Sequence, residues 1–173
     1  MRRFVAWSLI FSAVLCAPAW AIPGQTAAQL TAWGKANAAL QQFHASIDDE
    51  TGGTNYMATV VVDGYRAEYN AEPQGGRVHM EYIAFQNVSD AWFVELHMTV
   101  AIDAVRKIYG DAYAADFKNA KRIPHDGRVA AWQGKRLGYA TFGAALFVVD
   151  APEFANVLES MHVCDALDCS DDD

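Results

Sequence analysis

Two short patterns of histidine and glutamate have the residue types and spacing that could do chemistry. The chain reads His-x-Glu at 79–81 and Glu-x-His at 95–97, and a turn is expected between them. Alternate side chains of a strand share one face, and an antiparallel neighbour can present its own pair on that face. Imidazole and carboxylate both bind zinc, and an open coordination position activates water for hydrolysis. The pattern therefore permits a metal site formed by His79, Glu81, Glu95 and His97.

The same four residues have a second interpretation as polar pairs on an exposed sheet. We expect Met80, Tyr82 and Ala84 to face the core, so that His79 and Glu81 point to solvent. A register shifted by one pair places a histidine opposite a glutamate, which is a favourable pair without any cation. Exposed sheet side chains also seldom have the surrounding hydrogen bonds that hold metal ligands in place. We prefer this interpretation to the metal site.

Basic residues gather between positions 118 and 136. This segment holds six of the 13 lysines and arginines and one acid, Asp126, in a chain whose formal net charge is −8. Such a segment would attract an acidic protein face, an anionic glycan or lipid headgroups. The alternative is that lysines favour a helix C-terminus and arginines decorate a hairpin. The six residues are Lys118, Lys121, Arg122, Arg128, Lys135 and Arg136.

The chain contains no established catalytic or cofactor motif. It has no Gly-x-Ser-x-Gly sequence and no glycine-rich loop leading into a helix, so we predict no catalytic residue and no cofactor. The acidic balance argues against nucleic acid, whose phosphates would be repelled. Aromatic residues on the expected strands, Tyr65, Tyr69 and Phe93, predict a contact surface for another macromolecule instead.

The first 21 residues have the features of a secretory signal peptide. Arg2 and Arg3 precede an apolar run, and Ala19-Trp20-Ala21 places small residues at the cleavage positions. The run is shorter than the ~20 residues that span a bilayer. We therefore expect cleavage near Ala21, a net charge that falls from −8 to −10 as two arginines are lost, a secreted or periplasmic location, and no membrane span in the mature chain.

Two cysteines, Cys164 and Cys169, remain after this cleavage. In an oxidising compartment the even count predicts a disulfide, and closing so small a loop would contribute about 2 kcal/mol. Five aspartates occupy the last nine positions. The expected organisation is a signal peptide at 1–21, a single domain at 22–163, and a disulfide-closed turn with an acidic tail at 164–173.

Apolar spacing predicts a helix over 26–44, with Thr26 and Gln29 forming a capping box. Alternating and β-branched runs then predict four strands, at 56–62, 65–70, 77–85 and 92–98. Asp63-Gly64 is the strongest turn signal, and Pro73 to Gly76 is the next turn.

Helical spacing returns over 99–121, with a break or bend at Gly110. Strands are expected at 128–132 and within 136–149, where Gly138 and Gly143 indicate bends or bulges. A last helix begins near Asp150, and its buried face is expected to consist of Phe154, Val157, Leu158 and Met161.

These elements predict an α+β fold: an antiparallel sheet of about six strands, made of a four-strand meander and a later hairpin. An N-terminal helix, a central long or broken helix and a C-terminal helix pack on it. Export and segregated charge favour a non-enzymatic binding module that acts through protein-protein or envelope contacts, in an inhibitor, immunity-type or adaptor role. The alternatives are a small metal-assisted hydrolase using the His/Glu cluster and a carrier of a small apolar ligand.

Overall fold

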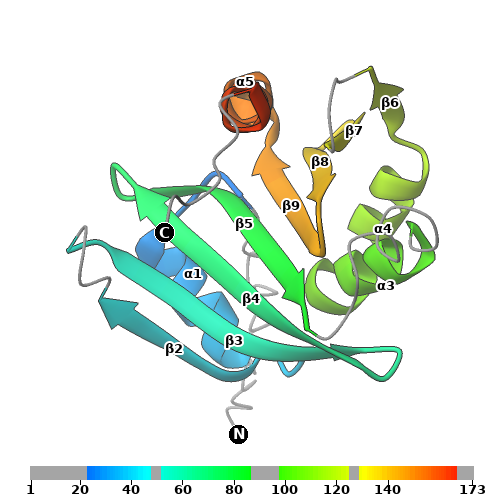
Figure 1. Ribbon diagram of the computed structural model, residues 1–173. Coiled ribbons are helices and arrows are strands. Elements are labelled where there is room, and N and C mark those ends of the chain that lie inside the picture. The colour runs from blue at the N-terminus through cyan, green and yellow to red at the C-terminus, as the bar shows by residue number, and fades with distance from the viewer. Residues whose placement is uncertain (1–22, 48–51, 87–97, 125–128, 167–173) are drawn as a thin grey trace, which may run out of the picture.

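One antiparallel sheet forms the body of the protein (Figure 1). The computed structural model describes residues 23–47, 52–86, 98–124 and 129–166. The strands are β1 (Gln25–Thr26), β2 (Gln41–Ile47), β3 (Thr54–Val62), β4 (Tyr65–Gln74), β5 (Arg77–Phe85), β6 (Lys121–Ile123), β7 (Ala130–Gln133), β8 (Leu137–Phe142) and β9 (Ala145–Asp150). The helices are α1 (Ala27–Ala36), α3 (Met98–Tyr109), α4 (Asp111–Lys118), the 3-10 turn η1 (Ala151–Glu153) and α5 (Phe154–Ala166).

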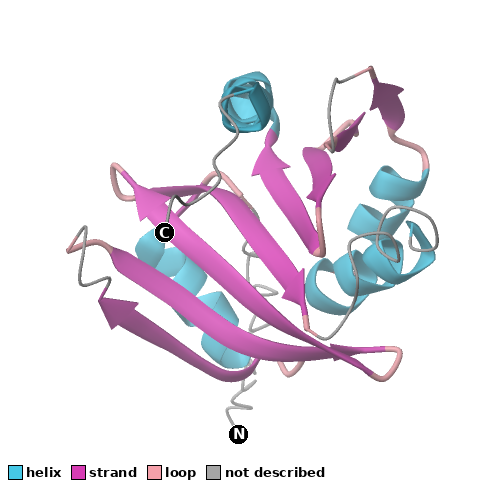
Figure 2. Cartoon of the chain, viewed as in Figure 1, coloured by secondary structure: helices cyan, strands magenta, loops and turns pink. Residues whose placement is uncertain are grey.

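The sheet has the order β2-β3-β4-β5-β9-β8-β7-β6, and the short β1 pairs with β5 beside the end of β9. The meander and the later strands therefore join through the pairing of β5 with β9 (Figure 2). The predicted α+β class with an antiparallel sheet is confirmed. The described residues contain more strands than the six expected, because β1, β2 and β6 were not predicted.

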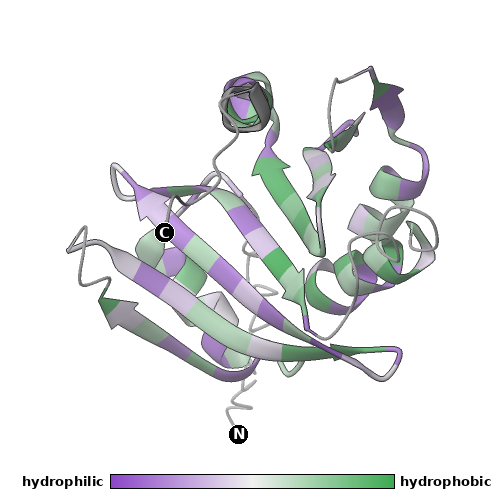
Figure 3. Cartoon of the chain, in the orientation of Figure 1, coloured by the Kyte–Doolittle hydropathy of each residue, from purple (hydrophilic) through white to green (hydrophobic). Residues whose placement is uncertain are grey.

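Two apolar cores lie on opposite faces of the sheet. Val148 belongs to the larger core with α1, α3 and α4, whereas Val149 belongs to a smaller core with Phe154 and Leu158 of α5. Successive strand residues point to opposite faces, so β9 is covered on both sides. This double burial explains why β9 is apolar along most of its length (Figure 3).

The first helix is shorter than its apolar spacing predicts. The capping box is confirmed, since the Thr26 hydroxyl accepts from the Gln29 amide and the Gln29 side chain accepts from the Thr26 amide. The helix ends at Ala36, where the Asn37 amide donates to the carbonyl of Trp33 at 2.8 Å. The prediction of helix to residue 44 is therefore wrong, because the chain turns back and forms β2.

The apolar period continued past Ala36 because Phe43 faces the same core as the helix. Its ring stacks on Tyr56 of β3, with centroids 5.8 Å apart, and lies over Gly34 of α1. A strand that folds back on a helix buries the same residues as one more helical turn would. Spacing alone does not separate the two arrangements.

Other local predictions have mixed outcomes. Asp63 and Gly64 both have positive φ, as a primed hairpin turn requires, and Gly110 separates α3 from α4 with φ 92°. Pro73 lies inside β4, so the next turn is Gly75-Gly76 alone. The expected strand at 92–98 lies outside the described residues except for its last residue, which begins α3.

Gly34→Ala should lower the free energy of unfolding by about 1–3 kcal/mol, because a Cβ there would lie 2.3 Å from the Phe43 ring. Helix propensity alone predicts the opposite, a gain of about 1 kcal/mol. Urea denaturation measures the change. In a Phe43→Leu background the loss should shrink, and a stabilised Gly34→Ala protein would contradict the close packing.

Candidate functional site

The basic segment folds into one end of the sheet. Lys118 ends α4, Lys121 and Arg122 form most of β6, and Lys135 and Arg136 lie in the turn from β7 to β8. All five side chains are exposed. Three segments that are separate in sequence therefore contribute to what we call the basic surface, defined as Lys118, Lys121, Arg122, Lys135 and Arg136. The sixth predicted residue, Arg128, lies outside the described residues.

A single carboxylate, that of Asp116 on α4, holds the β7–β8 turn against the helix. It accepts the backbone amides of Lys135 at 2.9 Å, Arg136 at 3.1 Å and Leu137 at 3.4 Å. The Tyr139 hydroxyl lies 3.2 Å from the same carboxylate. These bonds fix the place of Lys135 and Arg136 relative to Lys118.

Glycine at position 134 makes this close approach possible. A Cβ there would lie 2.2 Å from an Asp116 oxygen and 2.8 Å from the carbonyl of Leu137. Burial, and then the neighbouring carboxylate, raise the pKa of Tyr139 well above its ordinary value, so its hydroxyl keeps its proton as a donor. This role of Asp116 was not predicted from the sequence, although an acid next to a basic segment was a usable signal.

The register of β6 brings the helix end and the turn together. Lys121 pairs with Gln133, which directly precedes the turn, and Arg122 pairs with Trp132. The Arg136 guanidinium lies 5.3 Å from the centre of the Tyr113 ring on α4. This distance allows a cation–π contact, which orders the side chain without neutralising its charge.

The charges of the basic surface have no acidic partners within the described part of the chain. The ion pairs found there join Arg106 to Asp103 and Asp111, and place His79 near Asp150. Asp116, which lies on α4 next to these cations, directs its oxygens to backbone amides. Five cations therefore remain available to an incoming anion.

Within the described residues, β6 is also the last strand at one edge of the sheet. Lys121 and Arg122 are successive, so they point to opposite faces and flank the free edge. An edge strand has backbone donors and acceptors that can pair with a further strand. Arg122 also lines a hollow of about 300 Å³ with Ile123, Pro124, Val129 and Ala130.

The expected exposed patch of His79 and Glu81 is not formed. Glu81 has 1% of its surface exposed and lies in the larger core with Ile83 and Phe85, whereas Met80 packs in the smaller core under α5. The alternation was therefore assigned to the wrong face. Met80, Tyr82 and Ala84 on one face and Ile83 and Phe85 on the other are all apolar enough to be buried, and both faces of β5 are covered.

A β-bulge in β5 adds to this error, because it changes which face of the sheet the residues before Glu81 point to. Ala71 pairs with Glu81 but Pro73 pairs with Val78, so β5 has one extra residue between these pairs. Val78 and Glu81, which differ in parity, are consequently both buried.

His79 faces a hollow beside α5, with its Nδ1 atom 3.7 Å from a carboxylate oxygen of Asp150. No group of three or more His, Cys, Asp or Glu side chains suited to a metal ion exists among the described residues. Glu95 and His97 lie outside them, so the four-residue metal site stays a prediction that would now need a different arrangement.

Glu81 instead forms a buried polar cluster with two tyrosines. The Tyr109 hydroxyl donates to its Oε2 atom at 2.5 Å. The Oε1 atom and the Tyr69 hydroxyl have no partner within hydrogen-bonding distance, although Tyr69 is near enough to lower the carboxyl's pKa. Trp33 of α1 stacks on Tyr109 at 6.0 Å and tilts against Tyr69 at 6.2 Å.

Burial dominates the electrostatics of this cluster. It raises the pKa of Glu81 from 4.5 to about 7, although the two tyrosine hydroxyls pull in the other direction. Burial and then the Glu81 charge also raise the pKa values of Tyr69 and Tyr109 well above 10. The tyrosines therefore remain donors, and Glu81 changes its charge near neutral pH.

The predicted aromatic surface is partly wrong. Tyr65 is exposed as expected, with 37% of its surface accessible, but Tyr69 is fully buried beside Glu81. Phe93 lies outside the described residues, and so does Cys169 of the predicted disulfide. Tyr69 is on the same face as Ala67 and Ala71, whose small side chains leave room for its ring in the core.

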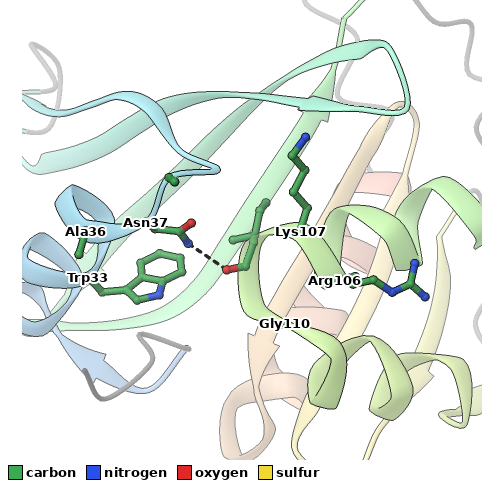
Figure 4. A pocket seen from close by; sticks show the side chains of 8 residues that line it. Trp33, Ala36, Asn37, Arg106, Lys107 and Gly110 are labelled. Carbon is green, nitrogen blue, oxygen red and sulfur yellow. Dashed lines mark hydrogen bonds between the residues drawn. The ribbon is translucent and has the colours of Figure 1, made fainter. Parts of the chain in front are cut away.

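A hollow of about 390 Å³ lies between the C-terminal ends of α1 and α3. Figure 4 shows the Trp33 ring and Asn37 on one side, with the Asn37 amide donating to the carbonyl of Ile108 at 2.9 Å. Arg106 points away from this hollow (Figure 4). The lining is mainly apolar, and it lies directly above the stacked Trp33 and Tyr109 rings.

Comparisons with known proteins do not assign this site. No protein-family model, curated protein or solved structure matches the chain. Within the described residues, none of the helices has the length and apolar character needed to cross a membrane.

Asp116→Ala should lower the free energy of unfolding by about 2–4 kcal/mol, because it removes a charged acceptor from three backbone amides. Asp111→Ala on the same helix is the control, since its side chain is 93% exposed, and it should cost less than about 1 kcal/mol. Thermal or urea unfolding compares the two. Equal losses would show that Asp116 does not anchor the turn.

The free energy of unfolding should fall as the pH rises from about 5 to 8. The folded protein holds the Glu81 proton up to about pH 7, while the unfolded chain releases it near 4.5, so the stabilisation by this proton is lost across that window. The expected loss is roughly 3 kcal/mol. In Glu81→Gln the slope should flatten, and in the exposed control Glu72→Gln it should remain; an unchanged slope in Glu81→Gln would contradict this assignment.

Proposed function

We propose that this protein is a non-enzymatic binding module that docks an acidic protein partner on the basic surface after export from the cytoplasm. The observation that carries the proposal is the grouping of five exposed cations from α4, β6 and the β7–β8 turn at one end of the sheet, in an otherwise acidic chain. Opposite charge on the partner would speed encounter, and the acidic remainder of the surface would repel an acidic partner that approached elsewhere.

Two features of the site favour a polypeptide over a small anion. The cations are spread along an edge strand and the turn beside it, and they do not converge on one point. An extended acidic segment could pair with the free edge of β6 while its side chains meet Lys121 on one face and Arg122 on the other. The Asp116 bonds hold Lys135 and Arg136 in place before the partner arrives, which reduces the entropy lost on binding.

A second candidate function is supported by the hollow beside Trp33. Its volume of about 390 Å³ is within the range of sites for small ligands, and its lining of Trp33, Ala36, Ala38 and Ile108 suits an apolar molecule. This is the carrier alternative. Native mass spectrometry after gentle purification would favour it if a stoichiometric apolar ligand co-purified, and a Trp33→Ala variant would then lose that ligand.

The docking proposal is tested with poly-L-glutamate as the probe. The wild-type protein should bind it with an affinity that falls as salt is added, because the contact is between exposed charges. Lys121→Glu/Lys135→Glu should weaken binding by about tenfold or more at low salt, which corresponds to about 1.4 kcal/mol. Titration calorimetry measures both constants.

The control changes the same amount of charge elsewhere on the molecule. Lys35→Glu/Arg66→Glu alters two exposed cations on α1 and β4, far along the sheet order from β6. It should change the affinity by less than about twofold. Equal losses in the two double variants would show a non-specific charge effect, and preferential binding of heparin or anionic vesicles over poly-L-glutamate would replace the protein partner with a glycan or lipid.

A further inference from the structure

The buried cluster around Glu81 joins the end of α3 to the paired strands β4 and β5. Glu81 lies on β5, Tyr69 on β4 and Tyr109 at the last position of α3. All three side chains have at most 1% of their surface exposed. Apart from tyrosines, the buried polar or charged side chains among the described residues are Asn70, Glu81 and Thr141, and Glu81 is the one carrying an ionisable carboxyl. The end of α3 is therefore attached to the sheet through a group that can gain or lose charge.

The contact between Tyr109 and Glu81 lies at a place where the chain can pivot. Gly110 follows directly, with φ 92°, and separates α3 from α4. The Asn37 side chain bridges α1 to the carbonyl of Ile108, one residue before Tyr109. The hollow between α1 and α3 opens beside these contacts. A small movement of the end of α3 would consequently widen this hollow without unfolding the helix.

When Glu81 is ionised, its carboxylate oxygens are not both hydrogen-bonded. With Glu81 ionised, Tyr109 supplies one short hydrogen bond and the Oε1 atom has no partner within bonding distance. A buried carboxylate with one neutral donor is costly, and the cost falls when the group is protonated or reaches water. Water can reach Glu81 if α3 moves away from the sheet.

We propose that Glu81 and Tyr109 form a proton-operated latch, which holds the end of α3 against the sheet when Glu81 is protonated and loosens it when Glu81 is ionised. The latch acts locally at the seam between α1 and α3. The remainder of the sheet keeps its packing in both states. The consequence of the latch is a hollow beside Trp33 that is narrower in mildly acidic conditions and wider above neutral pH.

Every titratable group that faces Glu81 is compatible with a latch that loosens when Glu81 is ionised. From β4 and α3 it faces Tyr69 and Tyr109, whose raised pKa values keep them neutral. From α1 the uncharged Trp33 stacks on Tyr109, and the strand neighbours of Glu81 are Ala71 on β4 and Val148 on β9. Tyr113 and Tyr139 lie farther out, next to Tyr109. The change of charge in this cluster near neutral pH therefore belongs to Glu81.

Amide hydrogen exchange between pH 6 and 8, corrected for the intrinsic exchange rates, tests the latch. Amides near the C-terminal end of α3 and around Asn37 should lose protection by about tenfold or more beyond the loss in the hairpin of β3 and β4, whose amides report the fall in global stability. Glu81→Gln should abolish the local change. A parallel change in all segments would show global destabilisation only and would overturn the latch.

Two further variants separate the latch from a general loss of packing. Tyr109→Phe removes a donor to the ionised carboxyl, and that donor lowers the pKa of Glu81, so the midpoint of the local transition should move to higher pH. Tyr69→Phe should move it in the same direction. An unmoved midpoint, or one moved to lower pH, would contradict the assignment. If Glu81→Gln does not fold, the infrared band of the neutral carboxyl in the wild type and in Tyr109→Phe reports the same midpoints directly.

Discussion

The carboxylate of Asp116 is the interaction on which the candidate site depends. Lys118 and Lys121 are close in sequence, whereas Lys135 and Arg136 are brought beside them by the pairing of β6 with β7 and are held against α4 by the bonds of their backbone amides to this one side chain. A turn held through its amides leaves its own side chains free, so the cations of the turn remain directed outward. The glycine at 134 allows the close approach, and the Tyr139 hydroxyl adds a further contact from β8. The protein thus uses a half-buried negative charge to arrange a positive surface.

Glu81 is a second acid that holds elements together, in a very different setting. Asp116 is half-buried and accepts several backbone amides, whereas Glu81 is fully buried and its one short hydrogen bond comes from Tyr109. Burial raises the pKa of Glu81 to about 7, so this carboxyl can change its charge near neutral pH. Asp116 supports the proposed docking surface, and Glu81 underlies the proposed latch at α3.

Local patterns predicted the elements that are decided by their own residues. The capping box at Thr26, the positive-φ turn at Asp63-Gly64 and the break at Gly110 each depend on a few adjacent positions, and all three are present. The class of the fold followed from the succession of such elements. The basic segment was also recognisable, because its charges are close in sequence and charged side chains tend to remain at the surface.

Predictions that depended on which face of a strand or helix is covered by other elements were less successful. Residues 41–47 continue the apolar spacing of α1 but form β2, because Phe43 folds back onto Gly34. Glu81 was expected to point outward because Met80, Tyr82 and Ala84 were expected to face the core, yet both faces of β5 are covered and a bulge changes its alternation. Tyr69 was expected at a contact surface but is buried beside Glu81. No local pattern in β4 or β5 indicates that α3 would place Tyr109 above them.

The most direct test of the docking proposal is a footprint of the bound acidic chain on the protein. Hydrogen exchange would be measured with and without saturating poly-L-glutamate at low salt, so that each segment reports its own protection. The account predicts new protection over residues 118–123 and 133–137, with the edge of β6 protected most strongly. Protection confined to the α1–α3 hollow or to the hollow beside His79, with residues 118–137 unchanged, would contradict it.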